Sequence, residues 1–357
     1  MIEAATRPVA FDPVRTPYRI DEREFPRTGR LTEQFRFLLR YAILAPSTHN
    51  SQPWRFALSE NGIEVYADYG RRLPVADPGH RELLMSLGAA IYTLRVAAAY
   101  YGFRCDVDYE LSLASDRPVA TVYLDPAGQL SDAEVRAAQL LPHVASRRTN
   151  RHPFLVSRVP LSVVQRLEEV AQHRAAQLTI STDGSVNNRV AALVEDAERR
   201  QYADPSFRRD VAEWIHANRT SDEDGMSGAT WGVGGIPSVI APWATRVLDL
   251  GRMRAAHDRN LCVEAPALVV MTSEDGVPHW LEVGEMLQHF LLAVTREGLQ
   301  ASYFNMPVQV PDLRAELKRE LRLPSWPQLV LRIGYCLAAT EPTPRRPLED
   351  VIMLRSA

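Results

Sequence analysis

The feature of this sequence that most restricts its fold is a pattern that occurs twice. In each half of the chain, a long apolar segment with helical periodicity ends at a glycine, Gly102 or Gly298, and an extended segment follows at once. Glycine commonly ends helices because it adopts the left-handed conformation without strain. A long helix followed by strands, present twice, predicts an α+β fold built from a duplicated unit.

The chain divides into three parts. Residues 1–30 are rich in Pro and Arg without a sustained period, which predicts an extended arm; residues 31–142 form the first half and residues 143–357 the second. Thr32 is the expected N-cap of the first helix. Apolar periodicity predicts helices at about 31–45, 79–101, 161–171, 187–217, 281–296 and 312–321, and strands within 54–59, 63–69, 105–111, 120–125, 177–182, 265–273, 300–304 and 327–336.

Composition is typical of a soluble globular protein and argues against two kinds of partner. The chain is 46% hydrophobic and 24% charged, with a formal net charge of −3, so it lacks the overall basic charge that favours nucleic acid or an anionic membrane. We find no signal peptide and no apolar run of about 18 residues. Three scattered cysteines without metal-ligand spacing fit a reducing compartment. These observations predict a cytoplasmic protein without a metal.

The most specific string is APSTHNSQPWRF, residues 45–56. Pro46 ends the preceding helix, and Ser47, Thr48 and Asn50 then offer side-chain donors and acceptors in a short loop. An asparagine amide both donates and accepts, so Asn50 can match the alternating C=O and N–H edge of a flavin pyrimidine ring. From these residues alone, a polar turn that joins a helix to a strand is the alternative interpretation.

A second string, RRTNRHPF at 147–154, places two arginines around a hydroxyl group. If Arg147, Thr149 and Arg151 converge, their charge-assisted hydrogen bonds form a phosphate site. Lys318 is the only lysine of the chain, so any anion site must be built from guanidinium groups, which suit phosphate. From these residues alone, a solvated basic turn is the alternative.

Together the two strings resemble the nitroreductase superfamily, whose signature APSxxNxQPW matches residues 45–54 and whose phosphate clamp resembles residues 147–154. The resemblance implies a nitroreductase-like α+β fold and FMN as the cofactor. It covers roughly residues 32–352 and is strongest to the Acg-like branch of NAD(P)H nitroreductases. The implied FMN contacts are Pro46, Ser47, Thr48, Asn50 and Gln52 at the flavin ring and Arg147, Thr149 and Arg151 at the phosphate.

The order of the two motifs implies a fused pair of halves. In nitroreductase dimers one subunit supplies the loop and the other the clamp, and the clamp precedes the loop along the chain; here it follows the loop. We therefore expect two half-domains that form an intramolecular pseudo-dimer with a single flavin site, the symmetry-related site being lost. Monomer and homodimer of such fused units both stay open.

Two later segments extend the resemblance. The string REGLQASYFNMP resembles the late helix of the family, after which backbone N–H groups near Asn305 and Met306 would approach flavin N5 and O4. The string PRRPLEDV resembles the basic tail of the family, in which Arg345 would complete the phosphate clamp.

The resemblance implies an FMN-dependent oxidoreductase that passes a hydride from NAD(P)H through flavin N5 to a nitroaromatic or a quinone. The cofactor carries this chemistry, so we assign no catalytic side chain. The alternative is an FMN-binding or sequestering protein with little or no turnover. The glycine-rich segment 221–238 is predicted to be a loop and a lid candidate; its apolar members are Met226, Trp231, Val233 and Ile236.

Overall fold

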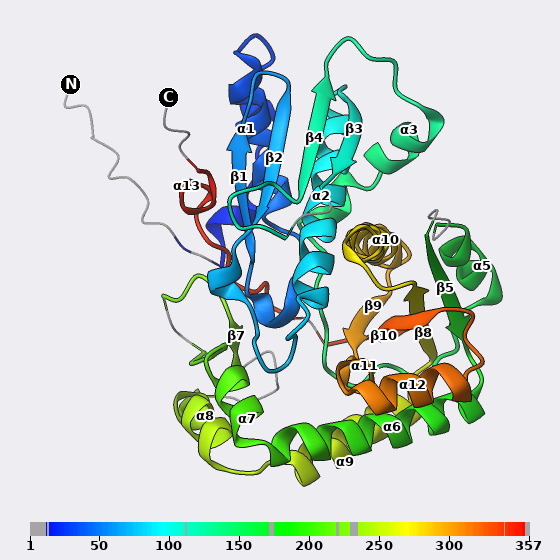
Figure 1. Ribbon diagram of the computed structural model, residues 1–357. Helices are drawn as coiled ribbons and strands as arrows, with labels where there is room; N and C mark the ends of the chain where they lie inside the picture. The colour runs from blue at the N-terminus through cyan, green and yellow to red at the C-terminus, as the bar shows by residue number, and fades with distance from the viewer. Residues whose placement is uncertain are drawn as a thin grey trace, which may run out of the picture.

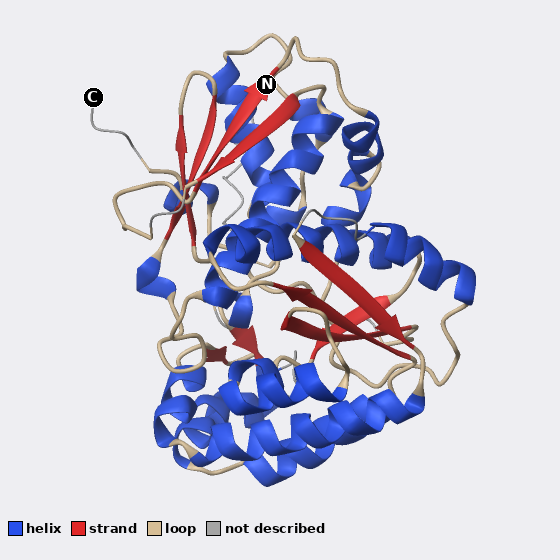
Figure 2. Ribbon diagram, turned by 45° about the vertical axis from the view of Figure 1, so that its right-hand side comes forward, coloured by secondary structure: helices blue, strands red, loops and turns tan. Residues whose placement is uncertain are grey.

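A computed structural model describes residues 12, 14–110, 113–170, 175–218, 221–228, 235–338 and 340–353 of the 357-residue chain. Two separate four-stranded antiparallel sheets, each accompanied by a long helix, dominate these residues (Figures 1 and 2). A layer of further helices covers the second sheet at the lower edge of Figure 1. The predicted α+β class is confirmed.

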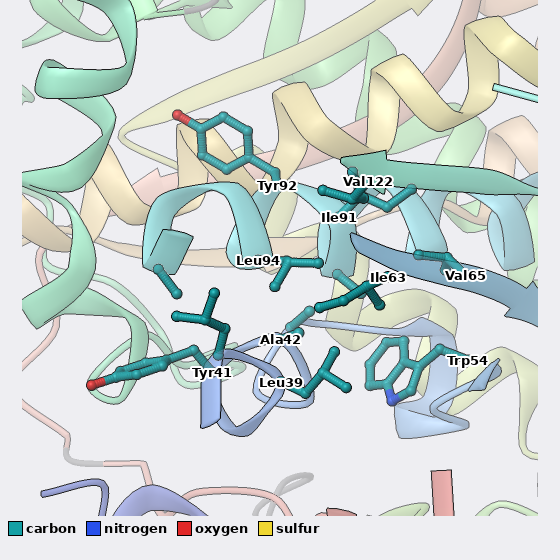
Figure 3. Close-up of a cluster of buried hydrophobic side chains, with 14 of the residues drawn as sticks. Leu39, Tyr41, Ala42, Trp54, Ile63, Val65, Ile91, Tyr92, Leu94 and Val122 are labelled. Carbon is teal, nitrogen blue, oxygen red and sulfur yellow. The ribbon is translucent and has the colours of Figure 1, made fainter. Parts of the chain in front are cut away.

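The first sheet has the strand order β1-β2-β4-β3. Burial alternates along several of its strands, because one face packs against α1 (Leu31–Ala42) and α2 (Arg81–Tyr100). The resulting core, which includes Leu39, Trp54 and Ile63, is shown in Figure 3. The strands are β1 (Trp54–Leu58), β2 (Gly62–Ala67), β3 (Arg104–Tyr109) and β4 (Ala120–Asp125).

The second sheet has the order β5-β8-β10-β9 and is covered on both faces. All seven residues of its inner strand β8 are buried, which explains the continuous apolar run in the sequence. The strands are β5 (Ala176–Ser181), β8 (Ala267–Ser273), β9 (Gln300–Tyr303) and β10 (Trp326–Gly334); α5 (Leu161–Val170) and α10 (Val277–Arg296) cover one face, and α6 (Gly184–Ala203), α9 (Gly251–Val263) and α12 (Pro311–Glu320) the other.

Shorter elements complete the described chain. The arm contains two 3-10 turns, and Tyr18 on the first of them donates a hydrogen bond from its hydroxyl to the Thr343 carbonyl at 3.0 Å. The other elements are α3 (Asp132–Ala138), α4 (Leu141–Val144), α7 (Pro205–Ala212), β6 (Ile215–His216), β7 (Met226–Ser227), α8 (Gly235–Val247), α11 (Met306–Gln309) and α13 (Leu348–Val351).

The two long helices meet at a pair of glycines. A Cβ atom on Gly88 of α2 would lie 2.0 Å from the carbonyl oxygen of Leu281, and one on Gly284 of α10 would lie 2.0 Å from the carbonyl oxygen of Met85. Each helix backbone therefore rests directly on the other, at a separation that no residue with a side chain permits.

The two helices also end alike. Gly102 and Gly298 have φ values of 90° and 74°. Behind them, the amides of Phe103 and Leu299 donate to the carbonyls of Ala98 and Val294 at 2.9 and 3.0 Å. This Schellman arrangement satisfies the last carbonyls of each helix, and it confirms that a strand follows a glycine-terminated helix in both halves.

Several predicted boundaries were wrong. Thr32 is not the N-cap, because the helix already begins at Leu31 and Glu33 accepts the backbone N–H of Arg30 at 3.1 Å. The single helix predicted for 187–217 is two helices, α6 and α7, because the proline at position 205 starts a new helix.

The segment 221–238 is not wholly a loop. Met226 and Ser227 form β7, which pairs in parallel with β6, and α8 begins at Gly235 and contains Ile236. The segment 229–234, which includes Trp231 and Val233, lies outside the described residues. Pro237 and Pro242 hid α8 from the periodicity analysis, since proline normally disfavours a helix interior.

One described helix, α2, is long and apolar enough to cross a membrane. It is 89% buried over its apolar window and packs against α1 and α10. It is therefore the core helix of this fold.

We expect Gly88→Ala to lower the free energy of unfolding by about 1–3 kcal/mol, because the new methyl group forces α2 and α10 apart. Gly184→Ala is the matched control, since a Cβ atom at that helical position meets nothing within 4 Å. Denaturant titration of both variants measures the difference. Equal stability of the two variants would show that the crossing tolerates a larger separation.

Candidate functional site

The loop of residues 46–52 is a compact, strained connection between α1 and β1. His49, Asn50 and Gln52 have φ values of 52°, 57° and 51°, a region that is costly for residues other than glycine. Ser47 stabilises the loop, because its hydroxyl accepts the backbone N–H of Gln52 at 2.9 Å. The surrounding contacts must therefore hold the loop in this shape.

Arg345 holds this loop to the C-terminal tail. Its guanidinium donates to the carbonyls of Ile43, Leu44 and Ala45 at 2.8, 3.2 and 3.2 Å and to Oδ1 of Asn50 at 2.9 Å. The side chain is only 1% exposed, and this burial lowers its pKa to about 10. The structure thus joins Asn50 and Arg345, but it directs the arginine at the loop; a phosphate contact for Arg345 stays a prediction.

Residues 222–226 lie directly on the loop. Gln52 donates to the Glu223 carbonyl at 2.8 Å, and Asn50 donates to the carbonyls of Gly225 and Pro344, both at 3.0 Å. The side-chain amides of Asn50 and Gln52 are therefore engaged by the chain itself. The lid candidate and the loop form one hydrogen-bonded unit.

An ion cluster fastens this segment. Asp224 accepts hydrogen bonds from Arg71 and from Nε2 of His216, the latter at 3.0 Å, and Asp222 lies 3.3 Å from Nδ1 of the same imidazole. The bond to Asp224 raises the pKa of His216, and burial only partly opposes it. Burial acts to raise the pKa of Asp224, but the bonds from His216 and Arg71 lower it overall.

The predicted clamp contains a buried cation, Arg147, that forms no ion pair within the described part of the chain. Arg147 is 5% exposed, and its Nε and Nη1 atoms have no hydrogen-bond partner among the described residues. Arg151 lies against the lid candidate, with Nη2 3.5 Å from Sδ of Met226, and burial lowers its pKa to about 10. Thr149 forms a bridge with Ala301, which places the clamp at the edge of β9.

Two other buried polar groups, close enough to Arg151 to be affected by its charge, also lack hydrogen-bond partners among the described residues. The Tyr303 hydroxyl and Nε2 of His49 are buried without a partner in the described chain. Burial raises the pKa of Tyr303 to about 12 against the opposing effect of Arg147 and Arg151. Burial, aided by Arg151, lowers the pKa of His49 to about 4, so the imidazole is neutral at physiological pH.

These groups fit an anionic polar ligand. Buried polar atoms of folded proteins nearly always have partners, and a buried unpaired cation is costly. Arg147, His49 and Tyr303 come from three separate parts of the chain, yet Arg151 acts electrostatically on both His49 and Tyr303. A phosphate-bearing ligand with hydrogen-bonding edges would supply the missing partners.

The remaining predicted residues border this cluster. Thr48 donates from its hydroxyl to Glu82 at 2.9 Å, and Glu82 also accepts from Gln309 at 2.8 Å. Asn305 follows β9, two residues after Tyr303, and its Oδ1 accepts the backbone N–H of Val330 at 3.1 Å. Met306 begins α11, and Pro46 is buried at the start of the loop.

Sequence analysis missed Tyr303, Glu82 and Arg332. Arg332 donates to the carbonyls of Arg151 and His152, each at 3.0 Å, and its guanidinium lies 4.1 Å from the ring centre of Phe154. It positions the clamp from the buried strand β10. Its sequence signal was available, because it is the only charged residue in the apolar run PQLVLRIGYC. Among the described residues no group of His, Cys, Asp and Glu could hold a metal.

Curated relatives align with nearly the whole chain. "Putative NAD(P)H nitroreductase acg" of Mycobacterium tuberculosis is 26% identical over 348 residues, which cover 93% of this chain and 98% of the relative. "Probable NAD(P)H nitroreductase PigM" of a Serratia species is 23% identical, over 88% and 91% of the two chains. No family model matches the sequence.

Among solved structures, similarity extends over part of the chain. The FMN-dependent nitroreductase NfnB of Mycobacterium smegmatis, in complex with NADPH, has a TM-score of 0.39 and 14% identity, covering 61% of this chain and 99% of NfnB. The NADPH:FMN oxidoreductase of Vibrio harveyi, complexed with NAD+, has a TM-score of 0.39 and 13% identity, covering 61% and 77%.

We expect residues 222–226 to loosen as the pH rises through the raised pKa of His216. A group whose pKa is raised by folding stabilises the structure while it is protonated, and that contribution is lost above the folded-state pKa. Hydrogen exchange of the Gly225 and Met226 amides measures the change. His216→Gln should remove the pH dependence, whereas His257→Gln, at an exposed position on α9, should retain it. Protection of these amides that does not change with pH in the unmodified protein would contradict the prediction.

Proposed function

We propose that this chain belongs to the nitroreductase superfamily and is an FMN-dependent NAD(P)H oxidoreductase of the cytoplasm. Relatives named as NAD(P)H nitroreductases, which cover 93% and 88% of the chain, support this proposal. A nitroaromatic or a quinone is the proposed acceptor. The supporting evidence is the agreement between a full-length sequence relationship and the buried polar atoms of Arg147 and His49, in the two sequence motifs, that have no partner among the described residues. The cytoplasm is supported by three cysteines that are all free thiols.

The observation that carries this proposal is that Nε and Nη1 of the Arg147 guanidinium have no hydrogen-bond partner among the described residues. Burying an ion costs several kcal/mol unless a partner compensates for it, so a protein retains such a group where a bound anion provides the compensation. Arg147 is nearly inaccessible, and the neighbouring arginine of the clamp, Arg151, is buried enough for its pKa to fall. The FMN phosphate has the charge and the acceptor atoms that the buried Arg147 guanidinium requires.

We assign the chain's own groups as follows. Arg147, Arg151 and the Thr149 hydroxyl bind the phosphate, and the backbone around Asn305 and Met306 faces the flavin ring. His49 and Tyr303 offer a neutral imidazole and a protonated phenol, so both can donate a hydrogen bond without adding charge. Arg332 holds the clamp, and Arg345 holds the loop. Bound FMN would supply two-electron hydride chemistry at N5.

We further propose that the chain is a pseudo-dimer with one FMN site. The same number of residues separates Gly88 from Gly284, Gly102 from Gly298, and Tyr109 from Asn305. At this counterpart of Asn305, the Tyr109 hydroxyl donates to the buried carboxylate of Glu285, which also pairs with Arg95. The counterpart position is thus filled by mutually satisfied side chains, which supports the loss of a second site.

The second candidate function is FMN sequestration with little or no turnover. It is favoured by the bonds that tie residues 222–226 to the loop, because Met226 reaches Arg151 of the clamp while Asn50 and Gln52 hold the backbone of the same segment. A segment fastened in this way would restrict access of NAD(P)H to the flavin.

We expect Arg147→Met to weaken FMN binding by roughly 10- to 150-fold, the usual effect of losing a hydrogen bond to a charged group. Riboflavin binding should change little, since riboflavin lacks the phosphate. The same variant should stabilise the ligand-free protein, because it removes an uncompensated buried charge. Flavin titration and thermal unfolding measure both effects.

Arg148→Met provides the control for this experiment. Arg148 is the adjacent arginine, but it lies over the ring of Tyr18 at 4.7 Å and donates to the Ala145 carbonyl. It should leave the ratio of FMN to riboflavin affinity unchanged. Equal losses for both ligands in Arg147→Met would assign this residue to the fold and not to the phosphate.

Anaerobic reduction separates the two candidate functions. We expect purified protein to release one FMN per chain, and NADPH or NADH to bleach the flavin absorbance near 450 nm rapidly. Photoreduction of the same sample is the control, because it shows that the bound flavin accepts electrons. If light bleaches the flavin and neither nicotinamide does, sequestration replaces the oxidoreductase proposal.

A further inference from the structure

On helix α8, large apolar side chains face outward and two polar side chains face the rest of the protein. Ser238 and Thr245 are buried on the side that packs toward α7 and β6. Val239 and Trp243, on the opposite side, are 66% and 61% exposed. A surface helix normally buries its large apolar residues and exposes its polar ones. The reversed arrangement on α8 indicates that its outward face is a binding surface.

The exposed apolar surface continues past the end of this helix. We call it the α8 patch, and it lies at the periphery of the molecule, at the lower left of Figure 1. Large exposed apolar patches on soluble proteins mark interaction sites. The α8 patch comprises the exposed large apolar residues of α8 and of the segment that leads into α9, which are Val239, Ile240, Trp243, Val247, Leu248 and, in the first turn of α9, Met253.

The size of the patch suits association with another protein surface. Its six side chains are 44–66% exposed, and apolar patches of a few hundred Å² on soluble proteins mark interaction sites. A standard protein interface buries about 800 Å² on each partner, so the patch would form the apolar centre of such an interface and the polar rim would supply the rest. Tryptophan is also the residue type most enriched at the energetic centre of interfaces.

The charges around the patch favour a second copy of this chain over a membrane. Arg246, Asp249 and Arg252 are exposed beside the apolar residues. A two-fold interface brings the same surface of both copies together. A rim with positive and negative charges can therefore pair an arginine of one copy with the aspartate of the other. A membrane-surface helix has a polar face rich in basic residues, which this mixed rim is not.

We propose that the α8 patch is the interface of a homodimer, with Trp243 at its centre. The dimer joins two chains that each already contain both halves, so it uses a surface other than the α2–α10 contact. None of the residues of the α8 patch belongs to the loop or to the clamp, so this proposal does not rest on the proposed function.

Sedimentation velocity of the full chain over a wide concentration range tests the proposal. The mass should rise from that of one chain, 40.1 kDa, to twice that value. Trp243→Glu should weaken the dimer by at least about 30-fold, the effect of removing an interface hot spot, and Val247→Glu, one helical turn away, should weaken it as well. Both residues are exposed, so melting temperatures should not change in the monomeric range.

Leu161→Glu is the matched control, because Leu161 is 71% exposed at the start of α5, in another part of the molecule. It should dimerise like the unmodified chain. A chain that stays monomeric at every concentration overturns the proposal, and so does a dimer that survives Trp243→Glu. A monomer that co-sediments with phosphatidylglycerol vesicles, and that loses this binding in Trp243→Glu, would overturn the dimer and assign the α8 patch to a membrane surface.

Discussion

The contact between α2 and α10 brings together the two halves of the molecule, each with its own sheet. Gly88 and Gly284 let the two backbones touch, and each helix carries its own sheet and ends in the same glycine-based cap. Because close-packed helices cannot slide without opening voids, the distance between the two sheets is fixed by these glycines. The loop of the first half and the clamp beside β9 consequently meet at a fixed separation, as a phosphate-bearing ligand requires.

The candidate site combines two kinds of buried arginine. Arg345 and Arg332 use their donors on backbone carbonyls and so behave as cross-links between segments that are distant in sequence. Arg147 has two guanidinium nitrogens, Nε and Nη1, without partners among the described residues, and a buried cation without a partner costs stability. Under the proposed function, Arg147 would recover this cost by binding the phosphate. The hydrogen-bond partners of an arginine thus distinguish a structural role from the proposed ligand-binding role.

Apolar periodicity predicted the strands of both sheets and both long helices, because these elements are strongly apolar. The glycine that follows each long helix marked its end. The same reasoning failed for α8, where two prolines interrupt the pattern, and it merged α6 with α7 across a proline that starts a helix. The motifs located the loop and the clamp by resemblance. They could not reveal that Asn50 and Gln52 bond to residues 223–225, because this pairing joins segments about 170 residues apart and depends on the tertiary fold alone.

Arg345 has a consequence for how the protein is made. Its bonds to Ile43, Leu44 and Ala45 span about 300 positions of the chain. Since translation proceeds from the amino terminus and early domains fold first, the loop leaves the ribosome long before the arginine that fixes it. The loop therefore lacks its bonds to Arg345 until synthesis is nearly finished. A chain that ends before residue 345 would contain the strands of both sheets but not the side chain that bonds to this loop.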